Sequence, residues 1–356
     1  MKRFAIVVAL ALAACPSTPP MSPSLPTTTT LPTTVLLTGE AFASDWAVSI
    51  VVATERERVR AQTLTVTIDA ALAEVSRQVS AWDKNAEVTR FSDARHLRPL
   101  HVSHGTALLV DVALGVAEST GGAFDPTIGP LLDVWGFSPR TKGMVTSIPS
   151  PEAIAAARAL VGWRHVQVHD GLLSKDTATA TLDVTSIADG AGASTVAVML
   201  RERGFANFLV DVAGEIVVAG HGEGHPWRVG INTPSVNAAA TDSVRQAVLS
   251  PSSSSLLSLS TSGTYREGWD KSGHRYSHII DPRTGSPVAH DLVSCTLVGV
   301  DAVVADALST ACVVLGEPAT RLVLAEYYPG YEALFIHAPT PTTFSTTTTT
   351  GFPPAP

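Results

Sequence analysis

The chain has few charged residues, few aromatic residues and almost no cysteine. Of its 356 residues, 16% are charged, 6% are aromatic and three are cysteines. Once Cys15 is set aside, Cys295 and Cys312 fit two buried free thiols as well as a disulfide. The hydrophobic share of 45% excludes disorder throughout and can bury a sizeable core, in one large domain or two small ones.

Clustered basic residues and common nucleotide-binding motifs are also missing. The formal net charge is −8, and no basic run appears beyond residues 56–60. This balance argues against a nucleic-acid binder, which needs clustered Lys and Arg to meet phosphates. The chain has neither GxGxxG after a first strand nor GxxxxGK[ST], so neither the common dinucleotide-binding fold nor a P-loop is expected.

Residues 1–14 have the pattern of a signal peptide. Lys2 and Arg3 precede an apolar stretch, residues 4–12, that is too short to span a bilayer. The stretch ends in Leu-Ala-Ala-Cys, which is typical of a bacterial lipobox, with Cys15 becoming the lipidated first residue. A plain secretory signal with a chance cysteine is the alternative. We expect an exported lipoprotein, anchored to the periplasmic face of a bacterial membrane through its acyl chains.

Both ends of the chain have biased composition. Residues 15–37 are rich in Pro and Thr, cannot form a core and predict an extended tether. Residues 338–356 have the same composition, including the run TTTTT, and predict a disordered tail.

Between the ends, the hydrophobic pattern predicts an α+β chain without the regular alternation of a doubly wound fold. Helices are expected at residues 68–80, 106–120, 151–161, 186–204 and 303–315. Strands are expected at residues 48–53, 63–67, 166–168, 181–184, 207–212, 215–219, 227–231, 256–259, 276–280 and 294–300.

The most informative stretch is TSGTYREGWDKSGHRYSHIIDPRTGSP, residues 261–287. His278 stands just before the sequence Asp-Pro-Arg-Thr-Gly at 281–285, which predicts a rigid turn because Asp and Thr bond local backbone and Gly accepts positive φ. Taken alone, such a histidine is more often structural than catalytic.

A second feature is DALSTACVVLG, residues 306–316. Asp306 and Thr310 stand four residues apart in a helical pattern and so share one helix face. Two hard oxygen ligands on one face suit Mg²⁺, although such a pair is usually a cap or a solvated surface.

Several segments in one order resemble the ApbE family, the FAD:protein FMN transferases. They are GGAFDPTIGPLLDVWGF (121–137), LDVTSIADGAG (182–192), FLVDVAGEIVVAG (208–220), the TSGTYR and HIIDPRTG strings, and ADALSTACVVLG (305–316). The resemblance implies one T-fold-like α+β domain of mixed sheets with packed helices, over residues 38–337.

The resemblance also implies an FAD site. FAD needs aromatic surfaces, a cation and carboxylates, and the chain has all three. At positions where the family binds FAD, this chain has Phe42, Trp82, Ala123, Phe124, Asp125, Asp183 and Asp189. Core packing is the alternative for Phe42 and Trp82, and helix capping is an alternative or additional role for Asp183.

The implied reaction is Mg²⁺-dependent phosphoryl transfer. The metal ligands carried over are the Ser186 carbonyl and the side chains of Asp306 and Thr310, which Mn²⁺ would also accept. A threonine hydroxyl of an acceptor protein attacks the FMN-side phosphorus of FAD and AMP leaves, with His278 as the base. The family's acceptors are flavoprotein subunits of membrane redox systems.

The chain departs from the family pattern at several positions. A family lysine near the pyrophosphate is Asp189 here, and this charge reversal should weaken binding unless the side chain turns away or Arg283 compensates. The first Gly of a Gly-Gly pair is Ala213, which matters if that position needs positive φ. The family's TSGDY is TSGTY, with Thr264, and a Tyr and an Asp become Ala191 and Ser194.

These departures leave two further hypotheses open. One is an FAD pyrophosphatase, in which water replaces the acceptor hydroxyl. The other is a non-catalytic FAD-binding lipoprotein, for which Asp189 is the main support. Retention of His278, Asp306 and Thr310 favours an enzyme.

Overall fold

The protein was analysed as a computed structural model that describes residues 32–145, 147–234, 243–251, 255–271, 273–340 and 343–355. The expected signal peptide, Cys15 and the tether up to residue 31 lie outside these ranges.

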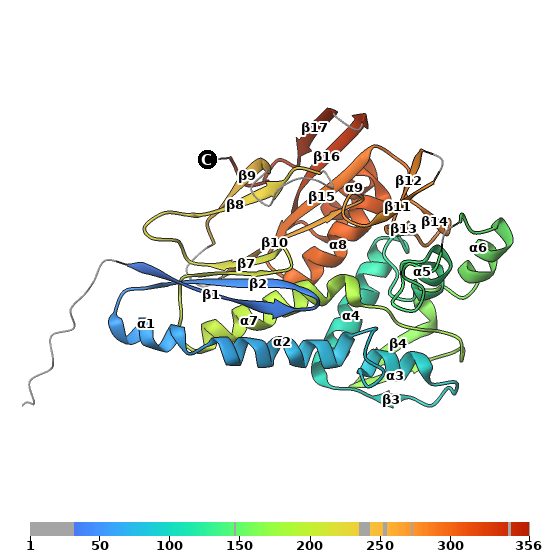
Figure 1. Cartoon of the computed structure of the whole chain (residues 1–356), viewed down its shortest axis with the longest axis horizontal. Coiled ribbons are helices and arrows are strands. Elements are labelled where there is room, and N and C mark those ends of the chain that lie inside the picture. Colours follow the sequence, from blue (N-terminus) through green and yellow to red (C-terminus); the bar gives the residue numbers. More distant parts are fainter. Residues whose placement is uncertain are drawn as a thin grey trace, which may run out of the picture.

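An eight-stranded antiparallel sheet forms the centre of the fold (Figure 1). Its strand order is β1-β2-β6-β7-β10-β15-β16-β17. The strands are β1 (Thr33–Ala41), β2 (Ser44–Val52), β6 (Phe208–Val212), β7 (Glu215–Ala219), β10 (Leu256–Gly263), β15 (Leu292–Gly299), β16 (Glu332–Thr340) and β17 (Thr343–Thr348). All seven neighbouring pairs are antiparallel.

Both faces of this sheet are covered, as β7 shows. All five of its residues are buried, and successive side chains of a strand point to opposite faces. Val217 and Ala219 pack in the cluster on the helical face, whereas Ile216 and Val218 pack in the cluster on the other face.

Helices α7 (Ala188–Glu202) and α8 (Ala302–Leu315) lie directly on one face, with α2 (Thr65–Val79) against α7 and α4 (His104–Ser119) against α8. Apolar spacing explains α2, in which Ile68, Leu72, Val75 and Val79 form one buried stripe. Asp301 caps α8 by accepting hydrogen bonds from the backbone N–H groups of Val303 and Val304, at 2.9 and 3.2 Å.

The other face is covered by the hairpin of β8 (Trp227–Asn232) and β9 (Ser243–Leu249) and by Phe352 from the C-terminal segment. The shorter elements are α1 (Glu55–Gln62), α3 (Glu87–Asp93), α5 (Gly129–Trp135), α6 (Pro151–Arg158), α9 (Glu317–Tyr327), β3 (Leu100–His101), β4 (Val166–His169), β5 (Leu172–Lys175), β11 (Gly268–Lys271), β12 (His274–Ser277), β13 (Ile280–Asp281), β14 (Ser286–Pro287) and the 3-10 turns η1 (Trp163–His165) and η2 (Thr185–Ile187). Among the described residues, no helix has both the length and the apolar composition needed to cross a membrane.

The α+β prediction is confirmed, but both biased ends extend the fold further than expected. The prediction of a disordered tail at 338–356 is wrong, because β17 pairs with β16 and Phe352 is buried. Threonine is β-branched and fits a strand, so a threonine run can complete a sheet. At the other end, β1 begins at Thr33, inside the expected 15–37 tether.

Two predicted strands do not form. Residues 65–67 begin helix α2, whose apolar stripe outweighs the β-branched threonines. Residues 181–184 have no regular structure; the Asp183 N–H donates to the Pro126 carbonyl at 2.7 Å instead of to a strand partner. Cys295 and Cys312, left open by the sequence, are both buried free thiols.

Candidate active site

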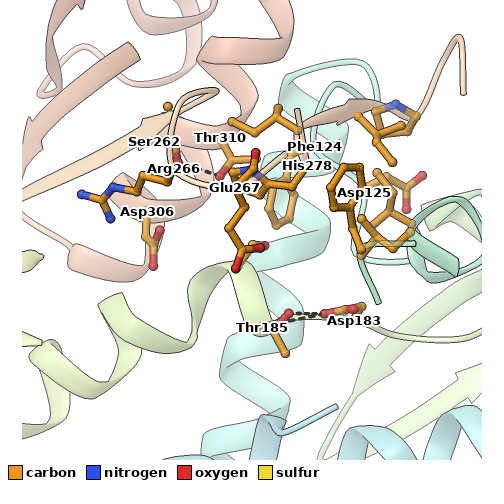
Figure 2. Close-up of a pocket in the computed structure, with 18 of the residues that line it drawn as sticks. Phe124, Asp125, Asp183, Thr185, Ser262, Arg266, Glu267, His278, Asp306 and Thr310 are labelled. Carbon is orange, nitrogen blue, oxygen red and sulfur yellow. Dashed lines mark hydrogen bonds between the residues drawn. The ribbon is translucent and has the colours of Figure 1, made fainter. Parts of the chain in front are cut away.

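A cavity of about 410 Å³ lies where the 121–137 segment, η2, β7, β10 and α8 meet (Figure 2). Its volume is in the usual range for small-molecule sites. The residues that line it come from separate parts of the sequence: Ala123, Phe124, Asp125, Ile128, Leu132, Phe137, Asp183, Thr185, Ser186, Asp189, Glu215, Thr261, Ser262, Gly263, Arg266, Glu267, His278, Ile279, Ile280, Pro282, Asp306 and Thr310.

His278 lies between β12 and β13, with its ring orientation fixed by a backbone carbonyl. Its Nδ1 is 3.0 Å from the carbonyl oxygen of Glu267. Because a carbonyl only accepts, Nδ1 carries the proton and Nε2 keeps a free lone pair in the neutral ring. Burial lowers the pKa of His278, although the Glu267 carbonyl and carboxylate oppose the effect. The neutral ring, a proton acceptor at Nε2, is therefore the dominant form at neutral pH.

The turn after His278 is as rigid as the sequence predicts. The Asp281 carboxylate accepts from the Arg283 backbone N–H at 2.9 Å and from its guanidinium at 2.8 and 2.9 Å. Gly285 has φ of 78°, and its carbonyl accepts from the Trp135 indole at 2.8 Å. These bonds tie the turn to α5 and fix the backbone that follows His278.

Asp306 and Thr310 both reach the cavity from α8, one helical turn apart. The Asp306 side chain is buried and accepts a hydrogen bond from the Gly190 N–H at 3.0 Å. This close approach requires glycine at position 190, because a Cβ there would lie only 2.7 Å from the Ala302 carbonyl oxygen. Thr310 Oγ1 lies 2.9 Å from Ser262 Oγ. Ser186, in η2 just before α7, lines the same cavity.

Three carboxylates share this part of the cavity: Asp189, Glu215 and Asp306. Burial raises the pKa of Asp189 to about 6, with the positive charge of Arg266 opposing the shift. Burial also raises the pKa of Glu215 and of Asp306. The negative charge of Asp189 raises the pKa of Glu215 further, and the charges of Glu215 and Asp189 raise that of Asp306. The Oε2 atom of Glu215 is buried and has no hydrogen-bond partner among the residues that the structure describes. Such a group of desolvated carboxylates favours the approach of a cation.

The residues present fit a magnesium ion with a small protein ligand set. Within the described ranges, no three His, Cys, Asp or Glu side chains converge closely enough to hold a metal by themselves. One carboxylate, one hydroxyl and one carbonyl, completed by phosphate oxygens and water, are the kind of ligands Mg²⁺ accepts. Asp306, Thr310 and Ser186 supply this set.

Ala123, Phe124, Asp125 and Asp183, the residues expected to contact FAD, all line the cavity. Asp125 Oδ1 accepts from the Thr127 N–H and hydroxyl at 2.8 and 2.6 Å, and its Oδ2 accepts from the Trp163 N–H at 3.1 Å. Asp183 Oδ1 accepts from the Thr185 N–H and hydroxyl at 3.0 and 2.5 Å, so its carboxylate holds the first residue of η2 (Figure 2), although the N-cap position itself is Val184.

Phe42 and Trp82 do not line the cavity. Phe42 sits in the β1–β2 turn with φ of 54°. Its ring lies close to Gly192 and packs against two clusters of buried apolar side chains on the helical face of the sheet. Trp82 is 66% exposed in the loop after α2. A small cavity of about 60 Å³ lies between its neighbour Ala81 and Asp183.

Comparison with known proteins decides the family. The ApbE family pattern matches residues 42–335. The chain belongs to the ApbE family. It is 37% identical to the FAD:protein FMN transferase of Vibrio cholerae over 257 residues, 72% of this chain and 74% of the relative. It is 34% identical to that of Klebsiella pneumoniae over 299 residues, 83% of this chain and 82% of the relative.

Solved structures agree. The flavin transferase ApbE from Vibrio cholerae superposes with a TM-score of 0.77 at 32% identity, covering 90% of this chain and 98% of that one. The apo flavinyl transferase ApbE of Pseudomonas stutzeri gives a TM-score of 0.76 at 30% identity, covering 90% and 95%. The ApbE chain described here is therefore a single-domain enzyme that transfers flavin from FAD.

Membership in the ApbE family gives meaning to the departures noted in the sequence. Arg283 does not compensate Asp189, because Arg283 is paired with Asp281 and does not line the cavity. Arg266 does line it, and its charge acts on Asp189, Glu215 and Asp306. Arg266 ends the TSGTYR string, but its place beside the carboxylates could not be predicted, because only the β10–β11 turn brings it to them.

The other substitutions have local consequences. Ala213 has φ of 55°, so this ApbE chain keeps a left-handed backbone at the position of a family glycine. The Thr264 backbone N–H donates to the Val293 carbonyl at 2.9 Å, and Thr264 does not line the cavity.

Proposed function

We propose that this enzyme transfers the FMN moiety of FAD to a threonine hydroxyl of an acceptor protein in a Mg²⁺-dependent reaction that releases AMP. The observation that carries the proposal is the shared cavity. A neutral histidine with a free Nε2 lies in the same cavity as a carboxylate and hydroxyl from one helix face.

The chain's own residues account for the proton. Nε2 of His278 takes the proton from the acceptor hydroxyl as its oxygen bonds to the FMN-side phosphorus. The bond from that phosphorus to the AMP oxygen breaks, and AMP leaves with the electron pair. The Glu267 carbonyl holds the ring in the required tautomer throughout.

Asp306, Thr310 and the Ser186 carbonyl would hold the metal beside the pyrophosphate. When bound there, Mg²⁺ neutralises charge that develops on the phosphate oxygens. Around Asp306 the described cavity carries a group of three carboxylates, Asp189, Glu215 and Asp306, beside the guanidinium of Arg266, so a divalent cation there also reduces the repulsion within this group.

The proposal extends to the cellular setting. The lipobox at Cys15 supports an exported lipoprotein held at the periplasmic face of a membrane, although Cys15 lies outside the described residues. An acceptor at that surface would be a flavoprotein subunit of a membrane redox complex.

The test uses residues 32–356, because β1 begins at Thr33. The protein is incubated with FAD, Mg²⁺ and a threonine-containing acceptor fragment, and AMP and in-gel flavin fluorescence are followed. His278→Ala should lower the rate about 10²–10⁴-fold without loss of FAD binding. Asp306→Ala should abolish the response to Mg²⁺.

His169→Ala is the matched control, because that side chain is 87% exposed on β4, and it should leave the rate unchanged. AMP without labelled acceptor would favour an FAD pyrophosphatase. Tight FAD binding with no AMP at all would refute the enzyme and leave the flavin-binding lipoprotein.

A further inference from the structure

A second groove adjoins the cavity on the far side of Asp125. Its volume is about 520 Å³, and Asp125 and Pro282 line both it and the cavity. Hydrogen bonds hold both carboxylate oxygens of Asp125 in place in this shared wall. One accepts from Thr127, and the other accepts from the N–H of Trp163, which lines the groove.

The groove is basic in a chain that is acidic overall. Arg158, Arg164 and Arg283 line it, whereas the whole chain has a formal net charge of −8. Arg283 is neutralised by Asp281. Arg158, at the C-terminal end of α6, and Arg164, in η1, are exposed and form no ion pair with any residue that the structure describes.

Both arginines are held on fixed backbone. The Arg164 guanidinium lies 4.2 Å from the centre of the Trp163 ring, and the Trp163 N–H is held by Asp125. Helix α6 packs against the turn that follows His278. A Cβ added to Gly285 in that turn would lie 3.7 Å from the Cβ of Arg158. Both arginines are therefore carried by backbone that packs against the wall of the cavity.

We propose that this groove docks an acidic segment of the acceptor protein, next to the threonine that receives the flavin. The proposal rests on the function proposed above. Two unpaired guanidiniums attract carboxylates, while the negative remainder of the surface repels them, so an acidic acceptor is oriented toward the groove. Because the groove shares its wall with the cavity, residues adjacent to the threonine are placed there when the threonine reaches His278.

The test uses the FAD-loaded full chain and two fluorescent peptides of equal length. Each carries one threonine, flanked by aspartates in one peptide and by asparagines in the other. Binding is followed by anisotropy and transfer by in-gel flavin fluorescence. The unmodified protein should bind the aspartate peptide about tenfold more tightly at low salt, and added salt should reduce the preference.

Charge reversal is the decisive comparison. Arg158→Glu with Arg164→Glu should remove or invert the preference, whereas Arg158→Lys with Arg164→Lys should largely retain it. Arg228→Glu is the matched control, an exposed arginine on β8 that lines neither space, and it should change nothing. Retained FAD binding shows that each variant is folded.

A preference that is absent in the unmodified protein, or that survives charge reversal, overturns the proposal. So does displacement of the aspartate peptide by inorganic phosphate at matched ionic strength, which would assign the groove to a small anion. Arginine-dependent binding without labelling supports the groove and refutes transfer. Labelling without preference supports transfer and refutes the groove.

Discussion

Replacing Asp189 by asparagine should stabilise the metal-free protein, because burial disfavours the charged carboxylate by more than the nearby Arg266 favours it. Burial raises the pKa of Asp189 from 3.8 to about 6. The shift means that ionisation of Asp189 costs about 3 kcal/mol more free energy in the folded protein than in the unfolded chain. This value is an upper bound, because the side chain keeps some contact with solvent. Asparagine keeps a similar shape and removes the charge.

The pH dependence gives the prediction its sign. A carboxyl whose pKa is higher in the fold destabilises it at every pH above the unfolded value, and most fully above the folded value. The gain from Asp189→Asn should therefore be about 2–3 kcal/mol at pH 7.5 and less than about 1 kcal/mol at pH 4. Urea unfolding in EDTA at the two pH values measures it.

Asp111→Asn is the control, since Asp111 is exposed on α4 and should change the free energy of unfolding by less than about 0.5 kcal/mol. An equal gain at both pH values would mean that packing, not charge, is responsible. No gain at pH 7.5 would show that Arg266 already neutralises Asp189.

Further predictions concern the backbone, the C-terminus and the base. Ala213→Gly should raise the free energy of unfolding in urea by about 0.5–1 kcal/mol, because it relieves the left-handed backbone of an alanine by more than it increases the entropy of the unfolded chain. The control, Ala156→Gly in α6, should lower the free energy of unfolding by about 1 kcal/mol. Phe352→Ala should cost about 2–4 kcal/mol in the same assay, whereas a disordered tail would give no loss; Thr346→Ala, exposed on β17, should cost less than about 0.5 kcal/mol. In a pH–rate profile, the midpoint of the acid limb should lie below the ordinary histidine pKa of about 6.5, because only neutral His278 accepts a proton and burial lowers its pKa. A midpoint at or above that value would contradict the role of His278 as the base.

The sequence predicted best those features that depend on neighbours along the chain. Helix α4, expected at 106–120, runs from His104 to Ser119, because a serine cap and a glycine pair mark its ends. The turn at 281–285 and the pairing of Asp306 with Thr310 on one helix face also follow from local spacing.

Features that depend on distant contacts were missed. Residue 82 was expected at the cavity, but the loop that carries Trp82 leaves it exposed. The role of Arg266 depends on β7 and α8, which lie far from it in the sequence. The threonine run of β17 resembles a linker in composition, and only pairing with β16 makes it part of the sheet.

The cavity wall draws on residues from Ala123 to Thr310. No proteolytic half of the chain contains the whole wall, so under the proposed function FAD binds only after both halves have come together. By mass action, FAD at about 100 times its dissociation constant would add about 2.7 kcal/mol to the intact fold and nothing to a fragment. Flavin retention during purification therefore reports the integrity of the whole domain.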